Sequence, residues 1–212
     1  MATSDDKSVP WLNGKKSGTV FYKLNDVRVA RGIGRSNKAP TLKQKTARQA
    51  TIVTSAFLDD VMPYVNIGFE SIGKMTKTNQ QNQAFSYNRK NAVQGTYPDV
   101  VIDFTKVLLS MGTKPLPTTL HADVIEDQLV LIWNTDVFAQ GAFWDDQVII
   151  MAYFPQLKNS VFLSGGAKRY QGTEHVPLKG IKRGYALHVF FSIISNDRAN
   201  ISNSIYLGEM NW

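Results

Sequence analysis

The chain has 212 residues, of which 43% are hydrophobic and 11% aromatic, a composition typical of a globular protein with a sizeable core. It contains no cysteine, which excludes disulfides, thiolate metal sites and cysteine nucleophiles. The formal net charge is +7, and the first 50 residues carry 11 lysines and arginines against three acids, which predicts a basic arm on a nearly neutral body.

The N-terminal segment predicts a protein that stays inside the cell in which it is made. Residues 1–10 are polar where a signal peptide carries its apolar core, and no apolar run approaches the roughly 18 residues of a membrane helix. We therefore expect no signal peptide, no membrane span, and a location in the cytoplasm or in an assembled particle. Residues 1–18 hold few apolar residues and predict a flexible or partner-ordered lead segment.

A β-hairpin is predicted within residues 19–30. Strand-forming residues there flank Asn25 and Asp26, a pair that accepts the positive φ values of a two-residue turn. An isolated two-stranded hairpin is marginally stable in water, so we expect it to lie against another surface or another chain. Residues 1–40 are therefore interpreted as a basic N-terminal arm that contains a β-hairpin.

A helix is predicted to begin at Thr41, because Thr41 and Gln44 have the spacing of a capping box. Apolar residues then recur every three or four positions, as one buried stripe requires: Ala47, Ala50, Val53, Phe57, Val61 and Tyr64. Residues 71–83 predict a polar loop, residues 84–93 a short helix, and residues 100–104 a half-buried strand. We assign residues 41–117 to a mixed helical segment that ends at Pro115 and Pro117.

The rest of the chain predicts a β-sandwich. Seven short apolar segments with turn signals between them follow: 120–126, 128–134, 147–154, 160–164, 173–178, 185–194 and 201–208. Alternation places core candidates on one face of three strands: Leu129, Leu131 and Trp133; Val148, Ile150 and Ala152; Leu187, Val189, Phe191 and Ile193. The predicted fold is mainly β with an α-helical middle segment, and residues 118–212 form an immunoglobulin- or fibronectin-like antiparallel β-sandwich.

Sequence motifs for catalysis are incomplete. Residues 14–17 lack the first glycine and the hydroxyl residue of a phosphate-binding loop, and residues 32–34 lack the third glycine of a dinucleotide fingerprint. Histidines His121, His175 and His188 have no metal-ligand spacing. We therefore predict no catalytic residues, no metal, no cofactor and no small-molecule substrate, and hence no enzyme.

The loop of residues 137–144 contains three aromatic residues that we expect to be exposed: Phe138, Phe143 and Trp144. Three aromatics in one loop favour a partner contact, and local packing is the alternative interpretation.

Motifs along nearly the whole chain also carry a resemblance to a known family. In order, they are Gly18–Tyr22 with Val29 and Arg31, Pro40–Gln44 with Arg48, Asn66–Phe69, Ser86–Val93, Gly95–Pro98, Asp103–Gly112 and Tyr206–Glu209. Together they resemble a domain-of-unknown-function family that is widespread in Bacteroidota. The resemblance implies an N-terminal hairpin and a C-terminal sandwich, and it implies no activity and no catalytic residues. The long aromatic loop before Asp145 departs from it.

Two functions from different classes follow as hypotheses. The first is a structural subunit of a homo-oligomeric or filamentous particle, such as a virion or phage-like component, whose arm reaches a neighbouring subunit by edge-strand addition. The second is a nucleic-acid-binding protein. Both place the contact on the same basic residues: Lys15, Lys16, Lys23, Arg28, Arg31, Arg35, Lys38, Lys43, Lys45 and Arg48. A solvated arm without a partner is the alternative interpretation.

Overall fold

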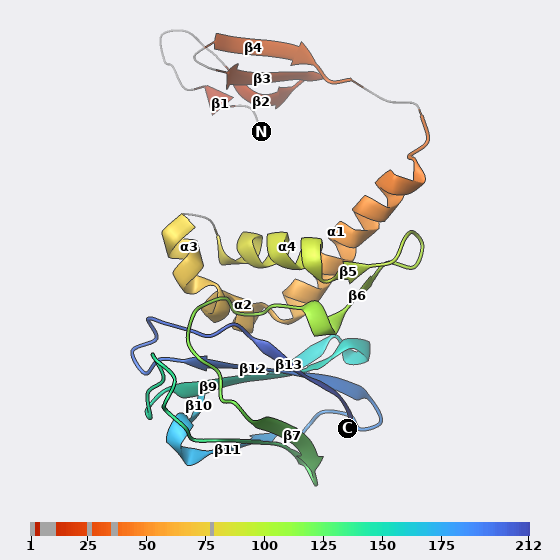
Figure 1. The fold of residues 1–212 in the computed structure, drawn as a ribbon. Helices are drawn as coiled ribbons and strands as arrows, with labels where there is room; N and C mark the ends of the chain where they lie inside the picture. The colour runs from red at the N-terminus through yellow and green to blue at the C-terminus, as the bar shows by residue number, and fades with distance from the viewer. Residues whose placement is uncertain (1–2, 5–11, 25–26, 35–37, 77–78) are drawn as a thin grey trace. The chain divides into compact units, whose positions relative to one another are not determined.

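A computed structural model describes residues 3–4, 12–24, 27–34, 38–76 and 79–212 (Figure 1). The chain divides into two compact units, residues 1–40 and residues 41–212. The described chain is mainly β, with helices in the middle of the sequence and antiparallel sheets after them, as predicted. The two units differ in how many layers of secondary structure they contain.

The first unit is a four-stranded antiparallel sheet with the order β1-β2-β3-β4. Its strands are β1 (Thr3–Ser4), β2 (Leu12–Lys16), β3 (Thr19–Leu24) and β4 (Val27–Gly32). Leu24 pairs with Val27, which confirms the predicted hairpin, while its predicted turn pair, Asn25 and Asp26, lies outside the described residues. A strand at residues 12–16 replaces part of the predicted lead segment. Ser17 and Gly18, at φ of 47° and 78°, make the turn that leads from it into β3.

None of the described side chains of the first unit is buried. Leu24 and Val27, which pair at the end of the hairpin, are 55% and 64% exposed. A single sheet layer has nothing to bury its apolar side chains against, since stable domains pack at least two layers around a core. The described part of this unit therefore encloses no core of its own.

The second unit begins with four helices: α1 (Leu42–Asp60), α2 (Met62–Gly68), α3 (Glu70–Thr76) and α4 (Gln80–Asn91). The predicted capping box is confirmed, because the Gln44 N–H donates to Thr41 Oγ1 at 3.3 Å and the Thr41 N–H to Gln44 Oε1 at 3.0 Å. Of the predicted apolar stripe, Ala47 is exposed, as are most side chains in the first two turns of α1.

Two local predictions in this region are wrong. Helix α3 occupies part of the predicted polar loop, and α4 begins at Gln80 because Asn79 caps it by accepting the Gln81 N–H at 2.8 Å. The predicted strand 100–104 is reduced to β6 (Val101–Ile102), which pairs with β5 (Val93–Gln94). Asp103 ends it by capping the short 3₁₀ helix η1 (Phe104–Lys106) through the Thr105 N–H.

Seven strands follow in two antiparallel sheets. They are β7 (Leu120–Ile125), β8 (Gln128–Trp133), β9 (Gln147–Phe154), β10 (Asn159–Lys168), β11 (Thr173–Pro177), β12 (Ala186–Ile194) and β13 (Ile205–Asn211), with short 3₁₀ helices η2 (Pro155–Leu157) and η3 (Arg169–Gln171). The sheet orders are β11-β8-β7 and β10-β9-β12-β13. The assignment to the immunoglobulin or fibronectin class stays a prediction.

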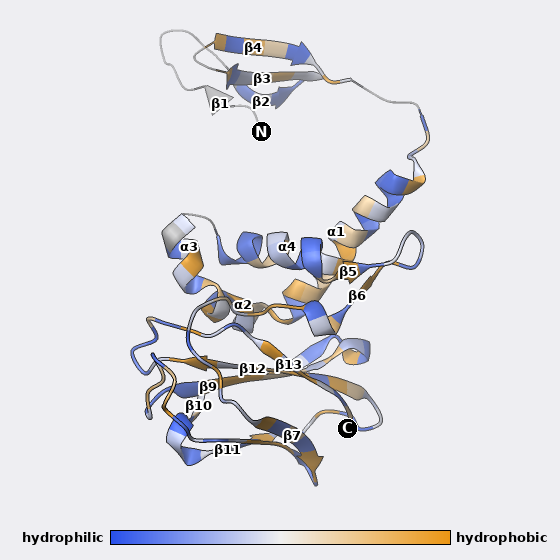
Figure 2. Cartoon of the chain, in the orientation of Figure 1, coloured by the Kyte–Doolittle hydropathy of each residue, from blue (hydrophilic) through white to orange (hydrophobic). Residues whose placement is uncertain are grey.

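The predicted strand phase is confirmed by the core between the two sheets. Every core candidate named from the sequence on β8, β9 and β12 lies in this cluster, together with Val176 of β11 and Trp212. Trp133 lies 5.9 Å from Phe191, measured between ring centroids, and its Nε1–H donates to the Arg169 carbonyl at 2.9 Å. Apolar residues concentrate on these strands, whereas α4 is mostly hydrophilic (Figure 2).

A second core lies on the opposite face of the four-stranded sheet. There Ile149, Met151 and Phe190 pack with residues of α1, α2 and α4, including Phe57 and Tyr64. Strands β9 and β12 are thus buried on both faces, and the helices form a third layer. The sequence predicts a domain boundary near residue 117, but one compact unit spans residues 41–212 because the outer face of the sheet is apolar and requires the helices. Among the described helices, none is long and apolar enough to cross a membrane.

Candidate functional site

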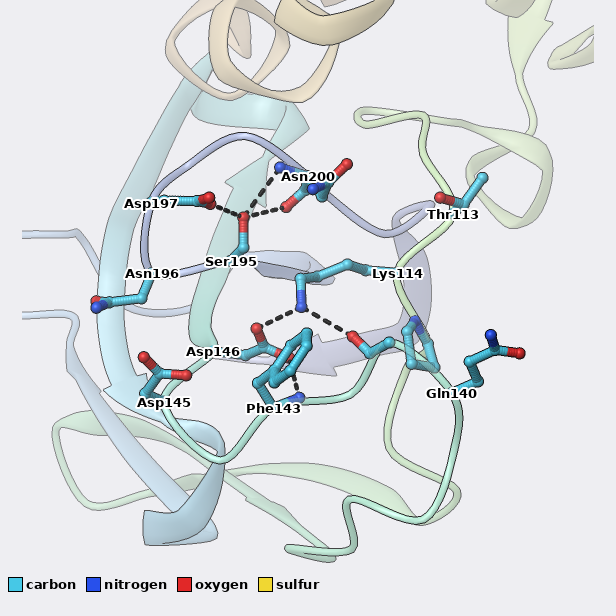
Figure 3. Close-up of a pocket in the computed structure, with 12 residues that line it drawn as sticks. Thr113, Lys114, Gln140, Phe143, Asp145, Asp146, Ser195, Asn196, Asp197 and Asn200 are labelled. Carbon is cyan, nitrogen blue, oxygen red and sulfur yellow. Dashed lines mark hydrogen bonds and ion pairs between the residues drawn. The ribbon is translucent and has the colours of Figure 1, made fainter.

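One end of the sandwich contains a cavity of about 450 Å³ (Figure 3). Three loops form it: the segment before β7, the β8–β9 loop and the β12–β13 loop. Nine of its twelve lining residues have polar side chains, and the full set is Thr113, Lys114, Pro115, Gln140, Gly141, Phe143, Asp145, Asp146, Ser195, Asn196, Asp197 and Asn200. Loops that meet at the end of a rigid sandwich are a common location for binding residues.

A buried ionic cluster supports this end. The Asp146 carboxylate is 1% exposed; one of its oxygens accepts from the Lys114 ammonium, and the other lies 3.5 Å from Arg169 Nε. Burial lowers the pKa of the Arg169 guanidinium, and the neighbouring Asp146 charge opposes that shift. Because buried charges are costly unless they are paired, the three side chains depend on one another.

The cluster holds the loops in place through backbone groups. Lys114 Nζ donates to the Gly141 carbonyl at 3.0 Å, and Asp146 Oδ2 accepts the Phe143 N–H at 2.9 Å, so two points of the β8–β9 loop are fixed. Arg169 Nη2 donates to the Pro115 carbonyl at 2.6 Å, which ties in the segment before β7. The loop end is therefore preorganised by charges that lie beneath it.

The predicted partner-loop aromatics lie on the surface at this end. Phe138 is 92% exposed, and Phe143 and Trp144 are each 58% exposed. Lys114 Nζ lies 4.9 Å from the Phe143 ring centroid, and Lys168 Nζ lies 5.6 Å from that of Trp144, both within cation–π range. Tyr170 adds a fourth exposed ring, 5.8 Å from Trp144 between centroids. The loop thus exposes aromatic surface to solvent.

Hydrogen-bond acceptors surround the opening of the cavity. The Ser195 hydroxyl donates to Asp197 at 2.5 Å, and this bond, followed by the Ala199 N–H, lowers the pKa of the Asp197 carboxyl. Asp145, Asn196 and Asn200 also line it (Figure 3). The lining residues of the cavity can therefore accept and donate hydrogen bonds, and Phe143 adds one aromatic ring. Among the described residues, no three His, Asp or Glu side chains are grouped as metal ligands would be.

The predicted basic residues lie mainly on the first unit. All of those described there are exposed: Lys15, Lys16, Lys23, Arg28, Arg31 and Lys38. The register pairs Lys15 with Val20 and Val20 with Arg31, so these two cations share one face of the sheet, whereas Lys16 lies on the other. Arg35 lies outside the described residues.

The remaining three basic residues, Lys43, Lys45 and Arg48, are exposed on the first turns of α1 in the second unit. Lys45 Nζ lies 5.3 Å from the ring centroid of Tyr97, so part of its environment is aromatic. These three cations belong to the second unit, whereas the other described basic residues belong to the first.

Sequence reasoning missed the parts of the loop-end site that are buried. Lys114 and Arg169 come from segments far apart in the chain, and no spacing rule connects them with Asp146. No local signal distinguishes these two cations from the other lysines and arginines of the domain, although any such group needs a carboxylate partner once it is buried.

The fold and these sites define a mainly β protein with a helical layer on a two-sheet sandwich, a small basic sheet before it and a loop-end cavity. A family model described as a family of unknown function (DUF6266) matches residues 13–208, and the chain belongs to this family. The match includes β3 and β4, so the β3–β4 hairpin belongs to the sequence by which the family is recognised. The resemblance to a family of unknown function is thereby confirmed; its distribution in Bacteroidota stays a prediction. No curated protein and no solved structure matches the chain.

Proposed function

We propose that this protein is a non-enzymatic assembly subunit, in which the N-terminal sheet of one copy contacts the same sheet of another copy within a homo-oligomer or filament. The observation that carries the proposal is the lack of any buried side chain among the described residues of the first unit. A single sheet layer encloses no core, so it gains stability when a second surface covers its apolar face, and in this proposal a second copy supplies that surface.

The register assigns the contact to one face. Five apolar side chains alternate onto the same side of the β3–β4 hairpin: Val20, Tyr22, Leu24, Val27 and Val29. Burying such a row between two copies removes apolar area from water at about 25 cal/mol per Å². The outer edge of β4, six residues long, adds backbone N–H and C=O groups that pair with a strand of another chain.

Charge predicts how salt affects this association. Lys15 and Arg31 lie on the same face as the apolar row, so two copies repel each other at low ionic strength. Salt screens exposed charges, and association between copies should therefore strengthen as salt rises. Binding to nucleic acid responds in the opposite direction, since released counterions drive it.

The experiment compares the full chain with residues 41–212 by size-exclusion chromatography and light scattering. We expect the full chain to exceed the monomer mass of 23.7 kDa and residues 41–212 to be folded monomers, because both hydrophobic cores consist of residues after 40. Val29→Asp should lower the mass of the full chain, whereas Ala30→Asp, one position along and on the opposite face, should not. Equal subunit numbers for the full and shortened chains contradict the proposal.

Nucleic-acid binding is the second candidate, favoured by the exposure of every described basic residue of the arm. Cations on both faces of a small sheet neutralise phosphates but read no bases, so binding should vary little with sequence. Affinity should fall with salt by a log–log slope of about −0.9 per duplex phosphate contacted, and alanine at Lys43, Lys45 and Arg48 should flatten the slope by up to about three units. Fluorescence anisotropy of labelled duplex and single-stranded oligonucleotides measures both. Absence of binding at low salt removes this candidate.

A further inference from the structure

We propose that the loop-end cavity of the second unit is a binding site for neutral carbohydrate, in which Phe143 stacks on a sugar ring and the surrounding carboxylates and amides bind its hydroxyls. All residues of this site belong to the second unit, and the proposal goes beyond the proposed assembly function. Four observations carry the inference: the hydrogen-bonding side chains of the lining, its charge balance, the aromatic ring at its opening and the rigidity of its base.

The lining matches a ligand that is rich in hydroxyl groups. Asp145 and Asp197 accept hydrogen bonds, while Gln140, Asn196 and Asn200 can donate and accept them. A sugar hydroxyl also donates and accepts, so groups of both kinds around one cavity satisfy it. A volume of about 450 Å³ lies within the roughly 300–1,000 Å³ of small-molecule sites.

The charge balance argues against an anionic ligand such as a phosphate. Three aspartates line the cavity, and Lys114 is the one lysine or arginine among the lining residues. Its ammonium is already engaged by the Asp146 carboxylate and the Gly141 carbonyl. No cation of the lining is therefore left to pair with an incoming anion, whereas a neutral sugar needs none.

Phe143 provides an aromatic face at the opening of the cavity. Phe143 is more than half exposed, and its backbone N–H donates to Asp146, so its backbone is fixed while much of the side chain stays accessible. The apolar C–H face of a sugar ring covers an aromatic ring of this kind and removes it from water. Figure 3 shows the Phe143 ring beside the Lys114 amine within the ring of polar lining residues.

Trp144 and Tyr170 extend the aromatic surface beyond the cavity. Their rings lie 5.8 Å apart between centroids, and the Tyr170 N–H donates to the Trp144 carbonyl at 3.1 Å, which fixes the two backbones together. A linear oligosaccharide that fills the cavity can continue over these rings. A protein partner fits the lining less well, because aspartate, serine and lysine are depleted in the buried centres of protein interfaces.

The test uses the full chain and a panel of neutral oligosaccharides built from glucose, galactose and mannose, screened by saturation-transfer NMR and then titrated calorimetrically. A matched set of sialylated and sulfated oligosaccharides forms the second arm. We expect transfer to at least one neutral oligosaccharide and less to the acidic ones. Absence of transfer to every neutral oligosaccharide, or stronger binding of the acidic set, overturns the proposal.

Variants then locate the site. Phe143→Ala should weaken binding by about fivefold to tenfold, as expected for one aromatic contact, and Asp197→Asn by a similar factor. Phe138→Ala is the matched control, since Phe138 belongs to the same loop and is exposed, but does not line the cavity. Both phenylalanines are exposed, so melting temperatures should stay unchanged. Equal losses in Phe143→Ala and Phe138→Ala contradict the assignment, and unchanged subunit numbers in these variants separate it from the assembly proposal.

Discussion

Both units of the chain carry apolar side chains on their strands, but the two units differ in how far these side chains are buried. In residues 41–212, three layers enclose two cores, and β9 and β12 are buried on both faces. In residues 1–40, alternating apolar residues lie on a single sheet with no second layer among the described residues. Amphipathic strands by themselves therefore do not make a domain. The stability of each unit depends on whether another layer covers the apolar face of its sheet.

Truncating Trp133 should produce the largest loss of stability. Trp133→Ala removes a buried ring and its hydrogen bond to the Arg169 carbonyl, and should lower the free energy of unfolding by about 3 to 5 kcal/mol. Trp133→Phe keeps an aromatic ring and should lose less. The contrasting variant is Tyr22→Ala in the first unit, which should leave the unfolding of residues 41–212 unchanged. Urea denaturation measures all three, and an unaltered midpoint for Trp133→Ala contradicts the described core.

Neutralising Asp146 should lower the free energy of unfolding nearly as much, because it leaves two buried cations, Lys114 and Arg169, without their partner. We expect Asp146→Asn to lower the free energy of unfolding by about 3 kcal/mol. The adjacent Asp145→Asn is the control and should change it by less than about 0.5 kcal/mol, since Asp145 is only half-buried. Similar losses in the two variants, measured by denaturant unfolding, would show that the ionic cluster does not stabilise the loop end.

Removing one buried hydroxyl of the helical layer should lower the free energy of unfolding by less than the two changes above. The Tyr64 hydroxyl donates to Ser192 at 2.7 Å where both residues are fully buried, and this burial raises the pKa of Tyr64 well above its usual range. Tyr64→Phe leaves the Ser192 hydroxyl without this partner and should cost about 1 to 2 kcal/mol. The double variant with Ser192→Ala should recover part of the loss. Additive losses in a double-mutant cycle would contradict the coupling.

Acid should weaken the contact between the helical layer and the sheet, by a smaller amount. His188 stacks on Phe104 at 3.9 Å between ring centroids, and burial lowers its pKa below the ordinary value of 6.5, against the opposing charge of Glu209. Below pH 6.5 the unfolded chain therefore binds more protons than the folded chain. The contribution of His188 to the free energy of unfolding is present above pH 6.5. It is lost as the pH falls toward the pKa of His188 in the folded chain. Unfolding measured on both sides of pH 6.5 should show a steeper acid decline for the natural chain than for His188→Gln.

Sequence patterns predicted most helices and strands of the second unit, because these elements depend on residues that are close together in the chain. The capping box at Thr41 and the alternation on β8, β9 and β12 depend on neighbouring residues, and both are confirmed. The failures were at points where a single polar residue decides the backbone. Asn79 starts α4 early, and Asp103 ends β6 and starts a 3₁₀ turn. A capping asparagine within a polar stretch resembles a loop until the helix after it is known.

The candidate site was predictable only in its exposed part. Phe138, Phe143 and Trp144 stand out because three aromatics in one loop are unusual, and the structure places all three on the surface. Lys114 and Arg169 meet Asp146 only through the tertiary fold, and no spacing in the sequence reports that meeting. The domain boundary near residue 117 failed for another reason. The continuous apolar runs of β9 and β12 are typical of strands buried on both faces, whereas alternation on one face was used to predict a two-layer sandwich.

Amide hydrogen exchange of the full chain at low and high protein concentration tests the central claim most directly. If the first unit is completed by another copy, protection of residues 19–24 and 27–32 should be weak at low concentration and rise with concentration, while β9 and β12 stay strongly protected at both. Val29→Asp should abolish the rise and Ala30→Asp should keep it. Protection of β3 and β4 that is as strong as that of β9 at low concentration, or that does not change with concentration, would contradict the account.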